Sequence, residues 1–295
     1  MASYRKKHIK GKIHRIKHPR NARKSIFIRP WFWIIILFLA ISASVFYFFL
    51  FYSGIQVKNI IISGNQKIAS KDIENLISDN INNKILSIRA PFGSWNLDSK
   101  SIFLIDNDRI EKDILQKFPV IEKVEINKHF PQNLILNVTE RKSFGAYCQN
   151  NNQCFSIDQN GIIFEQLSVI PDHFVIVRQI FEDKQVFTGE EVVAQNIINV
   201  IYQIEKNLKD NFQIDLKEAL ITSPIRLDVK TSENWKIYFD LDVSSDINLQ
   251  LTKLNLLLNG GIPAEPGGYS RKNLRYINLI PKDRAIICDN KICGG

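Results

Sequence analysis

One stretch of the sequence, Trp31 to Phe51, constrains the fold most, because its 21 residues include no charged residue and no proline. A helix rises 1.5 Å per residue, so about 20 apolar residues cross the hydrocarbon core of a bilayer. Backbone amides in lipid must bond within the segment, and a helix satisfies them. The sequence therefore predicts a transmembrane helix over residues 31–52. A buried helix of a soluble core is the alternative, but such a helix is rarely apolar on every face.

The charges on either side of this stretch indicate its orientation. Residues 1–30 contain eleven Lys or Arg and no Asp or Glu, and the next charge after the helix is Lys58. Basic flanks stay on the cytoplasmic side, so we expect a basic cytoplasmic tail and an extracytoplasmic C-terminal region. A cleaved signal peptide is the alternative. Its apolar region usually has roughly 7 to 15 residues, and here the small residues Ser42-Ala43-Ser44 lie inside the run.

The net charge of +9 originates in this tail. The tail contributes +11, which leaves about −2 for the rest of the chain. No large basic surface is therefore expected outside the membrane. The tail could bind nucleic acid, but topology and anionic lipid headgroups explain a basic segment beside a membrane helix more simply. We expect contact with the inner (cytoplasmic) membrane and none with nucleic acid.

The four cysteines all follow the membrane helix and form two local pairs, Cys148 with Cys154 and Cys288 with Cys293. This arrangement suits two short-loop disulfides in an oxidising compartment. Zinc bound by all four is the alternative, but neither spacing is usual for zinc ligands. Free thiols also remain open, and we expect no metal and no cofactor.

A first extracytoplasmic domain is predicted over residues 55–140. Period-2 and period-3.6 apolar patterns indicate the order strand, helix, helix, strand, strand, with Ser70 and Asp106 as helix caps and Pro119 ending the second helix. Residues 80–97 show no clear period and predict a loop or a short insertion, with exposed Phe92 and Trp95. Two helices on one face of a three-stranded sheet follow from this order.

A second domain is predicted over residues 141–287, where short strands and turns predominate. Asn160-Gly161 indicates a hairpin turn. Residues 191–209 predict a helix, as do those from the cap Asp246 to the glycines at 260–261, and strands are expected at 174–178, 220–230, 235–241 and 274–279. The last strand, 274–279, would lie at a sheet edge, with free amides and carbonyls for another chain.

Two segments carry a family resemblance. VKNIIISGNQKIASKDI, residues 57–73, resembles the start of a POTRA domain. FPVIEKVEINKHFPQNLILNVTER, residues 118–141, is similar to the closing hairpin of that domain in the bacterial cell-division proteins FtsQ and DivIB. Ile157-Asp158, Gly161 and Phe164 resemble the "β" domain of this family, although Asn278 stands where the family usually has Asp. The similarity covers roughly residues 20–287.

The resemblance implies an α+β fold: a single transmembrane helix, a POTRA-like domain, a mixed α/β "β domain" with a largely antiparallel sheet, and a cysteine-containing tail at 288–295. It also implies a divisome scaffold at the division septum that binds FtsB-like and FtsL-like proteins and other divisome members. The implied partner-binding residues are Leu274, Arg275, Tyr276 and Ile277, supported by Leu251, Leu254 and Leu258.

Enzymatic signatures are scarce outside the tail. Two histidines, His129 and His173, follow the membrane helix, and the sequence indicates no nucleophile beside either of them. No catalytic residue is therefore predicted. A membrane-anchored cell-envelope hydrolase is the alternative function. It would use Asp240 and Asp242, which the pattern places two apart on one strand face, as paired glycosidase carboxylates could be. An outer-membrane assembly factor would need a transmembrane barrel, for which the strands after Arg141 are too few.

Overall fold

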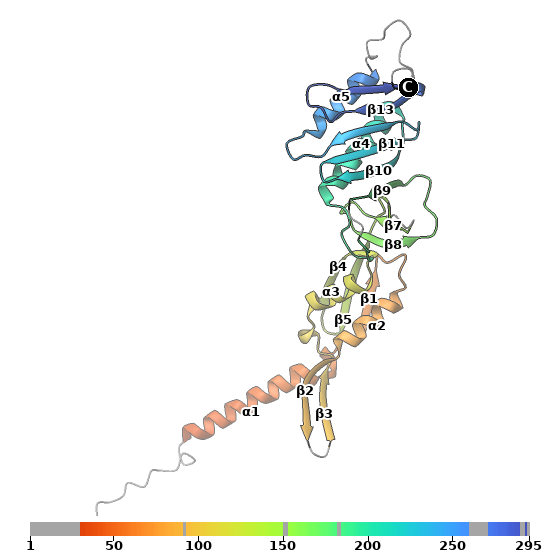
Figure 1. The fold of residues 1–295 in the computed structure, drawn as a ribbon. Coiled ribbons are helices and arrows are strands. Elements are labelled where there is room, and N and C mark those ends of the chain that lie inside the picture. Colours follow the sequence, from red (N-terminus) through yellow and green to blue (C-terminus); the bar gives the residue numbers. More distant parts are fainter. Residues whose placement is uncertain are drawn as a thin grey trace, which may run out of the picture. The chain divides into compact units, whose positions relative to one another are not determined.

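The computed structural model describes residues 30–90, 93–149, 153–181, 184–259, 271–289 and 293, with the backbone alone at 83–98 (Figure 1). The predicted basic tail, Phe92, the side chain of Trp95 and the glycines at 260–261 lie outside this description. The chain divides into two compact units, residues 1–52 and 53–295. Each unit is described by itself.

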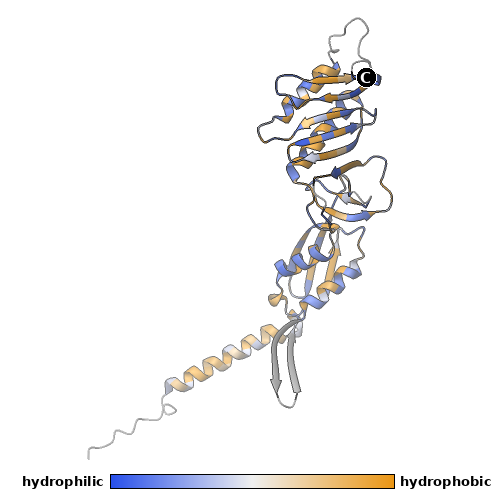
Figure 2. Ribbon diagram, in the orientation of Figure 1, coloured by the Kyte–Doolittle hydropathy of each residue, from blue (hydrophilic) through white to orange (hydrophobic). Residues whose placement is uncertain are grey.

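The first unit contains helix α1, Pro30–Phe51. Its 22 residues extend for about 33 Å at the usual rise, which is long enough for the hydrocarbon core of a bilayer. Figure 2 shows it as mostly hydrophobic, with pale turns between the hydrophobic ones. By length and composition this helix could cross a membrane, as the sequence predicts.

The second unit begins with a three-stranded sheet covered by two helices. The strands lie in the order β1 (Asn59–Ser63), β5 (Asn133–Glu140) and β4 (Ile121–His129), with β1 parallel and β4 antiparallel to β5. Helices α2 (Ser70–Ile81) and α3 (Asn107–Lys117) pack isoleucines against this sheet. Because both helices place an apolar residue every three or four positions, each buries one stripe and leaves a polar face outside (Figure 2).

The helix caps agree only partly with the prediction. Asp106 caps α3 through a hydrogen bond from the amide of Arg109, at 3.2 Å. Ser70 does not cap α2, because it is the first helical residue and Ala69 takes the cap position. The hydroxyl of Ser70 instead accepts a hydrogen bond from the side-chain amide of Asn65, which occupies the oxygen that a capping serine would use.

The second sheet has nine strands in the described part of the chain and mixes parallel with antiparallel pairs. In spatial order they are β14 (Ile286–Asp289), β13 (Leu274–Asn278), β12 (Lys236–Asp240), β11 (Arg226–Thr231), β10 (Leu216–Ser223), β9 (Val175–Gln179), β6 (Gly145–Cys148), β7 (Cys154–Ile157) and β8 (Ile163–Leu167). The pairs β6–β9, β9–β10 and β12–β13 are parallel and the others antiparallel. The α+β fold class with a largely antiparallel second sheet is confirmed.

Helices α4 (Gln195–Phe212) and α5 (Ile247–Asn259) contact each other, and both pack on the core of this sheet. Trp235 and Phe239 are its largest fully buried side chains. The predicted start of α4 at Glu191 is wrong. Backbone hydrogen bonds hold the segment before the helix to β8 instead, with Gly189 N–H on the carbonyl of Ile163 and the Ile163 N–H on the carbonyl of Glu190.

Two further sequence predictions differ from the structure. Residues 80–97 form a short insertion and not a loop, because β2 (Asn83–Ala90) and β3 (Gly93–Ser99) pair as an antiparallel hairpin. The single strand predicted at 220–230 is two strands, β10 and β11, joined by a turn at Pro224-Ile225. Proline has no amide hydrogen to continue a ladder, so a reversal at this point is favoured.

Candidate functional site

The expected edge of the second sheet is occupied. The sequence predicts residues 274–279 as the last, edge strand, but β14 pairs antiparallel with β13 on its outer side, opposite Ile277 and Asn278. This part of the prediction is wrong. Among the residues that the structure describes, the edge strand at this end is therefore β14. In the sequence, β14 is indicated only by the short apolar run Ile286-Ile287-Cys288. This run is no longer than a minimal strand and lacks the alternation of apolar and polar residues that identifies a strand.

The residues predicted to bind a partner on β13 divide between the two faces of the sheet. Leu274 and Ile277 are buried in the core, with Leu251 and Leu254 of α5 in the same cluster. Leu258 is partly buried against that core. Arg275 is exposed and donates from its guanidinium to the carbonyl of Cys293, at 3.2 Å. The leucines therefore pack behind the strand, while Arg275 lies on the surface at this end.

The amides of β14 that face outward can be identified by alternation. The amide of Leu279 donates to the carbonyl of Tyr238 on β12, so Ile277 also turns its backbone groups towards β12. Tyr276 and Asn278 then turn theirs towards β14, where they pair with Cys288 and Ile286. The backbone N–H and C=O of Ile287 therefore point away from the sheet.

Both cysteine pairs are joined in the structure. Cys148 on β6 and Cys154 on β7 are cross-strand neighbours linked by a disulfide, and a second disulfide links Cys288 to Cys293. The amide of Cys293 also donates to the carbonyl of Asp289, at 3.1 Å. The second disulfide thus joins Cys288 of the edge strand to Cys293.

An aromatic and charged row lies on the sheet face away from the buried core. The guanidinium of Arg226 stands 4.7 Å from the ring centre of Tyr238, and the rings of Tyr238 and Tyr276 are 5.2 Å apart. Two hydrogen bonds from Arg226 to the carboxylate of Asp228, of 2.7 and 3.2 Å, raise the pKa of the guanidinium. Burial raises the pKa of the Tyr238 hydroxyl. This row, from β11 to β13, leads towards the β14 edge.

The opposite edge of the sheet, at β8, is partly covered. The backbone of Ile163 is hydrogen-bonded to Gly189 and Glu190, in the segment before α4. Ile162 forms an isolated β-bridge with Glu191 of the same segment. Glu165 on β8 also pairs with Lys67, which lies between β1 and α2. A chain that added a strand at β8 would have to displace this segment, whereas the amide and carbonyl of Ile287 point outward at the other end.

A polar cluster joins the two sheets at the end of β5. Glu140 accepts hydrogen bonds from the amides of Gln66 and Lys67, at 2.7 and 2.8 Å. The next residue, Arg141, donates to the carbonyl of Pro119 at 3.0 Å and forms a 2.6 Å ion pair with Asp158. The side chains of Arg141 and Asp158 are only 12% and 5% exposed. Glu140 and Arg141, which end the segment 118–141 that carries the family resemblance, therefore have a structural role.

Asp158 also shapes the turn between β7 and β8. Its second carboxylate oxygen accepts from the amides of Asn160 and Ile162, both at 2.9 Å. Gly161 follows with a φ of +79°, and a Cβ there would lie 1.7 Å from the carbonyl oxygen of Val193. The hairpin turn predicted at Asn160-Gly161 is confirmed, and a glycine is required at this close approach.

The two acidic residues of the alternative hydrolase are not paired on a strand face. Asp240 is the last residue of β12, and Asp242 lies in the turn that follows. Asp240 accepts from the amide of Asp242 and from the hydroxyl of Ser245. The amide of Ser244 donates to the carboxylate of Asp242 and lowers its pKa. The prediction that both lie on one strand is wrong, because the strand ends between them.

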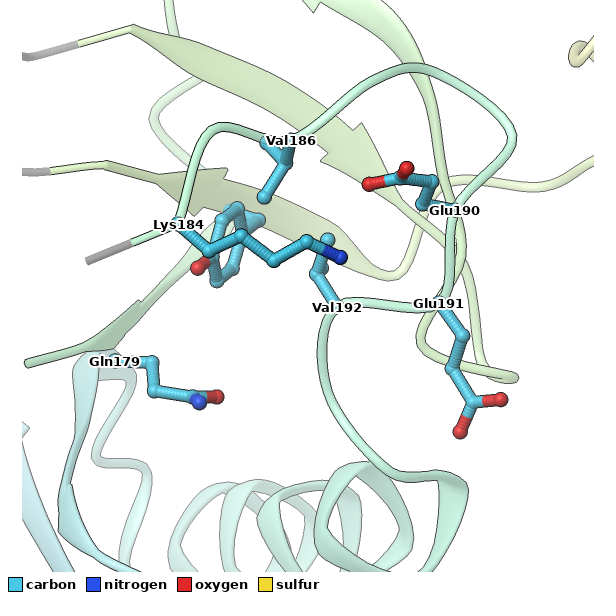
Figure 3. A pocket seen from close by; sticks show the side chains of 7 residues that line it. Gln179, Lys184, Val186, Glu190, Glu191 and Val192 are labelled. Atoms are coloured by element: carbon cyan, nitrogen blue, oxygen red, sulfur yellow. The ribbon is translucent and has the colours of Figure 1, made fainter. Parts of the chain in front are cut away.

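A small pocket lies beside β6 and the segment before α4 (Figure 3). Its lining includes Tyr147, Lys184 and Glu190, and its volume is about 60 Å³. Pockets for small organic ligands usually measure roughly 300 to 1,000 Å³, so this one has room for a few waters only. Among the described residues, no group of three or more His, Cys, Asp or Glu is placed to hold a metal ion.

Comparisons with known proteins agree with the fold. Residues 93–141 match the family model described as "POTRA domain, FtsQ-type". The chain is 32% identical over 151 residues to "Cell division protein DivIB" of Lactococcus lactis subsp. lactis strain KF147, and 31% identical over 151 residues to the protein of the same name in strain IL1403. Each match covers 48% of this chain and 38% of the relative, so less than half of either curated protein is spanned.

Proposed function

We propose that this chain, a member of the FtsQ/DivIB family of cell-division proteins, is a single-pass scaffold that holds partner division proteins at the outer face of the cytoplasmic membrane. The proposed organisation is a cytoplasmic tail at 1–30, a membrane helix at 31–52, a POTRA-like domain at 55–140 and a β domain at 141–287, followed by a short tail. Helix α1 supports the anchor by its length and composition. The basic residues before it support a cytoplasmic N-terminus.

The observation that carries the proposal is the outward-facing backbone of β14. An extended segment of a partner can pair with the amide and carbonyl of Ile287 and extend the nine-stranded sheet. Ile286, which is 43% exposed, offers an apolar contact beside that ladder. FtsB-like and FtsL-like division proteins are the proposed partners. The partner-binding residues proposed from the sequence, Arg275 and Tyr276, then stand one strand behind the contact.

This proposal predicts that Ile287→Pro releases the partner strand, because proline removes the outward amide hydrogen and keeps the inward bonds of Cys288 and Ile286. Ile287→Ala is the matched control, since it also trims the partly buried side chain and keeps the amide. We expect an FtsB-like partner to co-purify with the alanine variant and not with the proline variant. Cells that carry only the proline variant should form filaments.

Both variants must melt at the same temperature for this comparison to report on binding. Equal co-purification by the two folded variants, or normal septation with Ile287→Pro, would contradict strand addition at β14. A proline at Tyr276, by contrast, is no test of binding, because β13 lies between two strands and would lose an internal ladder bond.

The absence of catalysis belongs to the same proposal. A glycosidase of the paired-carboxylate type needs one carboxyl with a raised pKa to act as an acid. The pKa of Asp242 is lowered. Both carboxylate oxygens of Asp240 accept hydrogen bonds from residues in the turn after β12. These contacts favour a structural role for both residues over the alternative of an envelope hydrolase.

A further inference from the structure

The edge strand β14 is short, and within the described part of the chain it pairs with β13 alone. It has four residues, Ile286–Asp289. A short edge strand limits unwanted pairing with other chains, but so few ladder bonds on one side order the strand only weakly. Contacts outside the ladder must therefore help to keep it extended. Such contacts occur at residues 279–285, which join β13 to β14 and which we call the return loop.

Helix α5 holds the return loop through one lysine. The ammonium of Lys253 donates a hydrogen bond to the carbonyl of Pro281, at 3.0 Å, and another to the carbonyl of Lys282. Both acceptors lie between the last residue of β13 and the first residue of β14. Hydrogen bonds from a charged donor are stronger than those between neutral groups. Lys253 therefore ties the middle of the return loop to the helix.

The helix that carries Lys253 is itself fixed to the sheet. Gln250, one turn earlier on α5 and only 4% exposed, accepts from the amide of Asp240 and donates to its carbonyl, both at 2.9 Å. Leu251 and Leu254 pack in the core beside it. Because β12 and β13 are parallel, their C-terminal ends lie at the same edge of the sheet. Gln250 thus holds α5 at the end of β12, and Lys253 reaches the loop that follows β13.

The two ends of the return loop are held by packing. Leu279 is 1% exposed, and Ala285 is partly buried against the same core. The residues between them are more exposed, so packing restrains them less. The ammonium of Lys282 donates to the hydroxyl of Ser244 at 3.2 Å, but this contact lies on the surface, where water competes for both groups. Lys253 provides the stronger tie, because its ammonium binds the backbone of the loop twice.

We propose that Lys253 is a positioning residue for the partner-binding edge. By holding the return loop, its ammonium keeps β14 extended before a partner arrives, with the backbone of Ile287 directed outward. A partner strand then meets an edge that is already ordered, and less affinity is lost to ordering it. This inference rests on the proposed function, in which the partner pairs with β14. It adds that the affinity depends on a side chain of α5, outside the edge strand.

Three variants of the full chain, prepared in lipid nanodiscs, test this role. Lys253→Met keeps an apolar stem and removes the ammonium, whereas Lys253→Arg keeps a cation with several donors. Lys209→Met is the matched control, because it removes a lysine of α4 whose side chain is 66% exposed and whose ion pair with Asp215 measures 3.9 Å.

Two measurements are made on each variant. Amide hydrogen–deuterium exchange without any partner reports on the order of residues 279–289, with β10 and β11 as the internal reference. The dissociation constant is then measured with a labelled extracytoplasmic fragment of an FtsB-like protein.

We expect Lys253→Met to speed exchange at residues 279–289 about tenfold and to raise the dissociation constant by a similar factor, because a charged hydrogen-bond donor is lost. Exchange at β10 and β11 should not change. Lys253→Arg and Lys209→Met should stay close to the unmodified chain in both measurements. Faster exchange at β10 and β11 as well would show a general loss of stability and overturn the positioning role.

The other outcomes separate this inference from the proposed function. Unchanged exchange in Lys253→Met would overturn the positioning role, and so would faster exchange with an unchanged dissociation constant. A Lys253→Arg variant that exchanges as fast as Lys253→Met would overturn the role of the cation. All three results leave the proposed function standing. If the fragment does not bind the unmodified chain, the proposed function is refuted, and the role of Lys253 in binding is refuted with it.

Discussion

Removing Arg141 should destabilise the second unit more than the loss of any exposed charge. The Arg141→Ala substitution leaves the carboxylate of Asp158, 5% exposed, without its cation and removes the bond to the carbonyl of Pro119. Breaking one side of a buried ion pair costs about 3 to 5 kcal/mol. Asp158 keeps its two amide donors, which compensate part of the loss. We therefore expect the free energy of unfolding to fall by about 3 kcal/mol, the lower end of that range.

Urea unfolding of residues 53–295 with Trp95 replaced by Phe, followed by the fluorescence of the fully buried Trp235, measures this loss. Arg226→Ala is the matched control, because its ion pair with Asp228 involves an arginine side chain that is 43% exposed, and such pairs contribute roughly 0 to 1 kcal/mol. Asp158→Asn keeps an oxygen for the turn amides and removes the charge. It should cost less than Arg141→Ala.

The double variant Arg141→Ala with Asp158→Asn decides the cause. With no buried charge left unpaired, the double variant should lose less stability than the sum of the two single variants, by about 1 kcal/mol or more. The reasoning is refuted if Arg141→Ala costs no more than Arg226→Ala. Strict additivity of the two changes would equally refute it, because the loss would then arise from packing and not from the ion pair.

The remaining predictions concern the second sheet and its helices. Burial raises the pKa of Glu205, so the folded state binds a proton more tightly than the unfolded state and loses stability as the pH rises through that window. Glu205→Gln should therefore raise the melting temperature at pH 7.5 and change it little at pH 4, which a pH series of thermal melts would measure; an equal gain at both pH values would contradict this. Gly161→Ala should destabilise the β7–β8 hairpin by more than about 1 kcal/mol, the usual minimum cost of a strained backbone. Two causes add here, because alanine would have a positive φ and its Cβ would clash with the carbonyl oxygen of Val193. Urea unfolding of this variant and of Gly189→Ala tests the prediction, because a Cβ at Gly189 would lie 3.6 Å from its nearest neighbouring atom at a similar φ. Equal losses of unfolding free energy in the two variants would contradict the clash with Val193 and attribute the cost to φ alone.

Much of the fold could be predicted where periodicity is strong. Strands β4 and β5 alternate cleanly, and α3 carries a capping aspartate, an apolar stripe and a proline beyond its end, so each was predictable from neighbours in the sequence. Local signals failed where a distant segment competes for the backbone. The residues from Gly189 to Val192 look like the start of a helix, yet they bond to β8 because that strand offers unpaired amides.

The candidate site shows the same division. The leucines of α5 and the apolar positions of β13 were predictable as a supported strand, because their spacing alone places them on buried faces. The interior position of β13 was not predictable, because the order of strands in a sheet depends on which distant segment pairs with each strand. The junction of Arg141 with Asp158 likewise joins residues whose partnership no local pattern specifies.

The amino-acid sequence alone was enough to predict the properties that depend on composition along the chain: an apolar helix long enough for a bilayer, the charge asymmetry around it, and two α+β regions after it. A bilayer responds to length and charge, and these can be counted along the chain. The pairing of β14 with β13, the outward direction of the Ile287 backbone and the contact of Arg141 with Asp158 became clear from the three-dimensional structure alone. These facts arise from pairing between distant segments, whose free energy depends on packing in three dimensions.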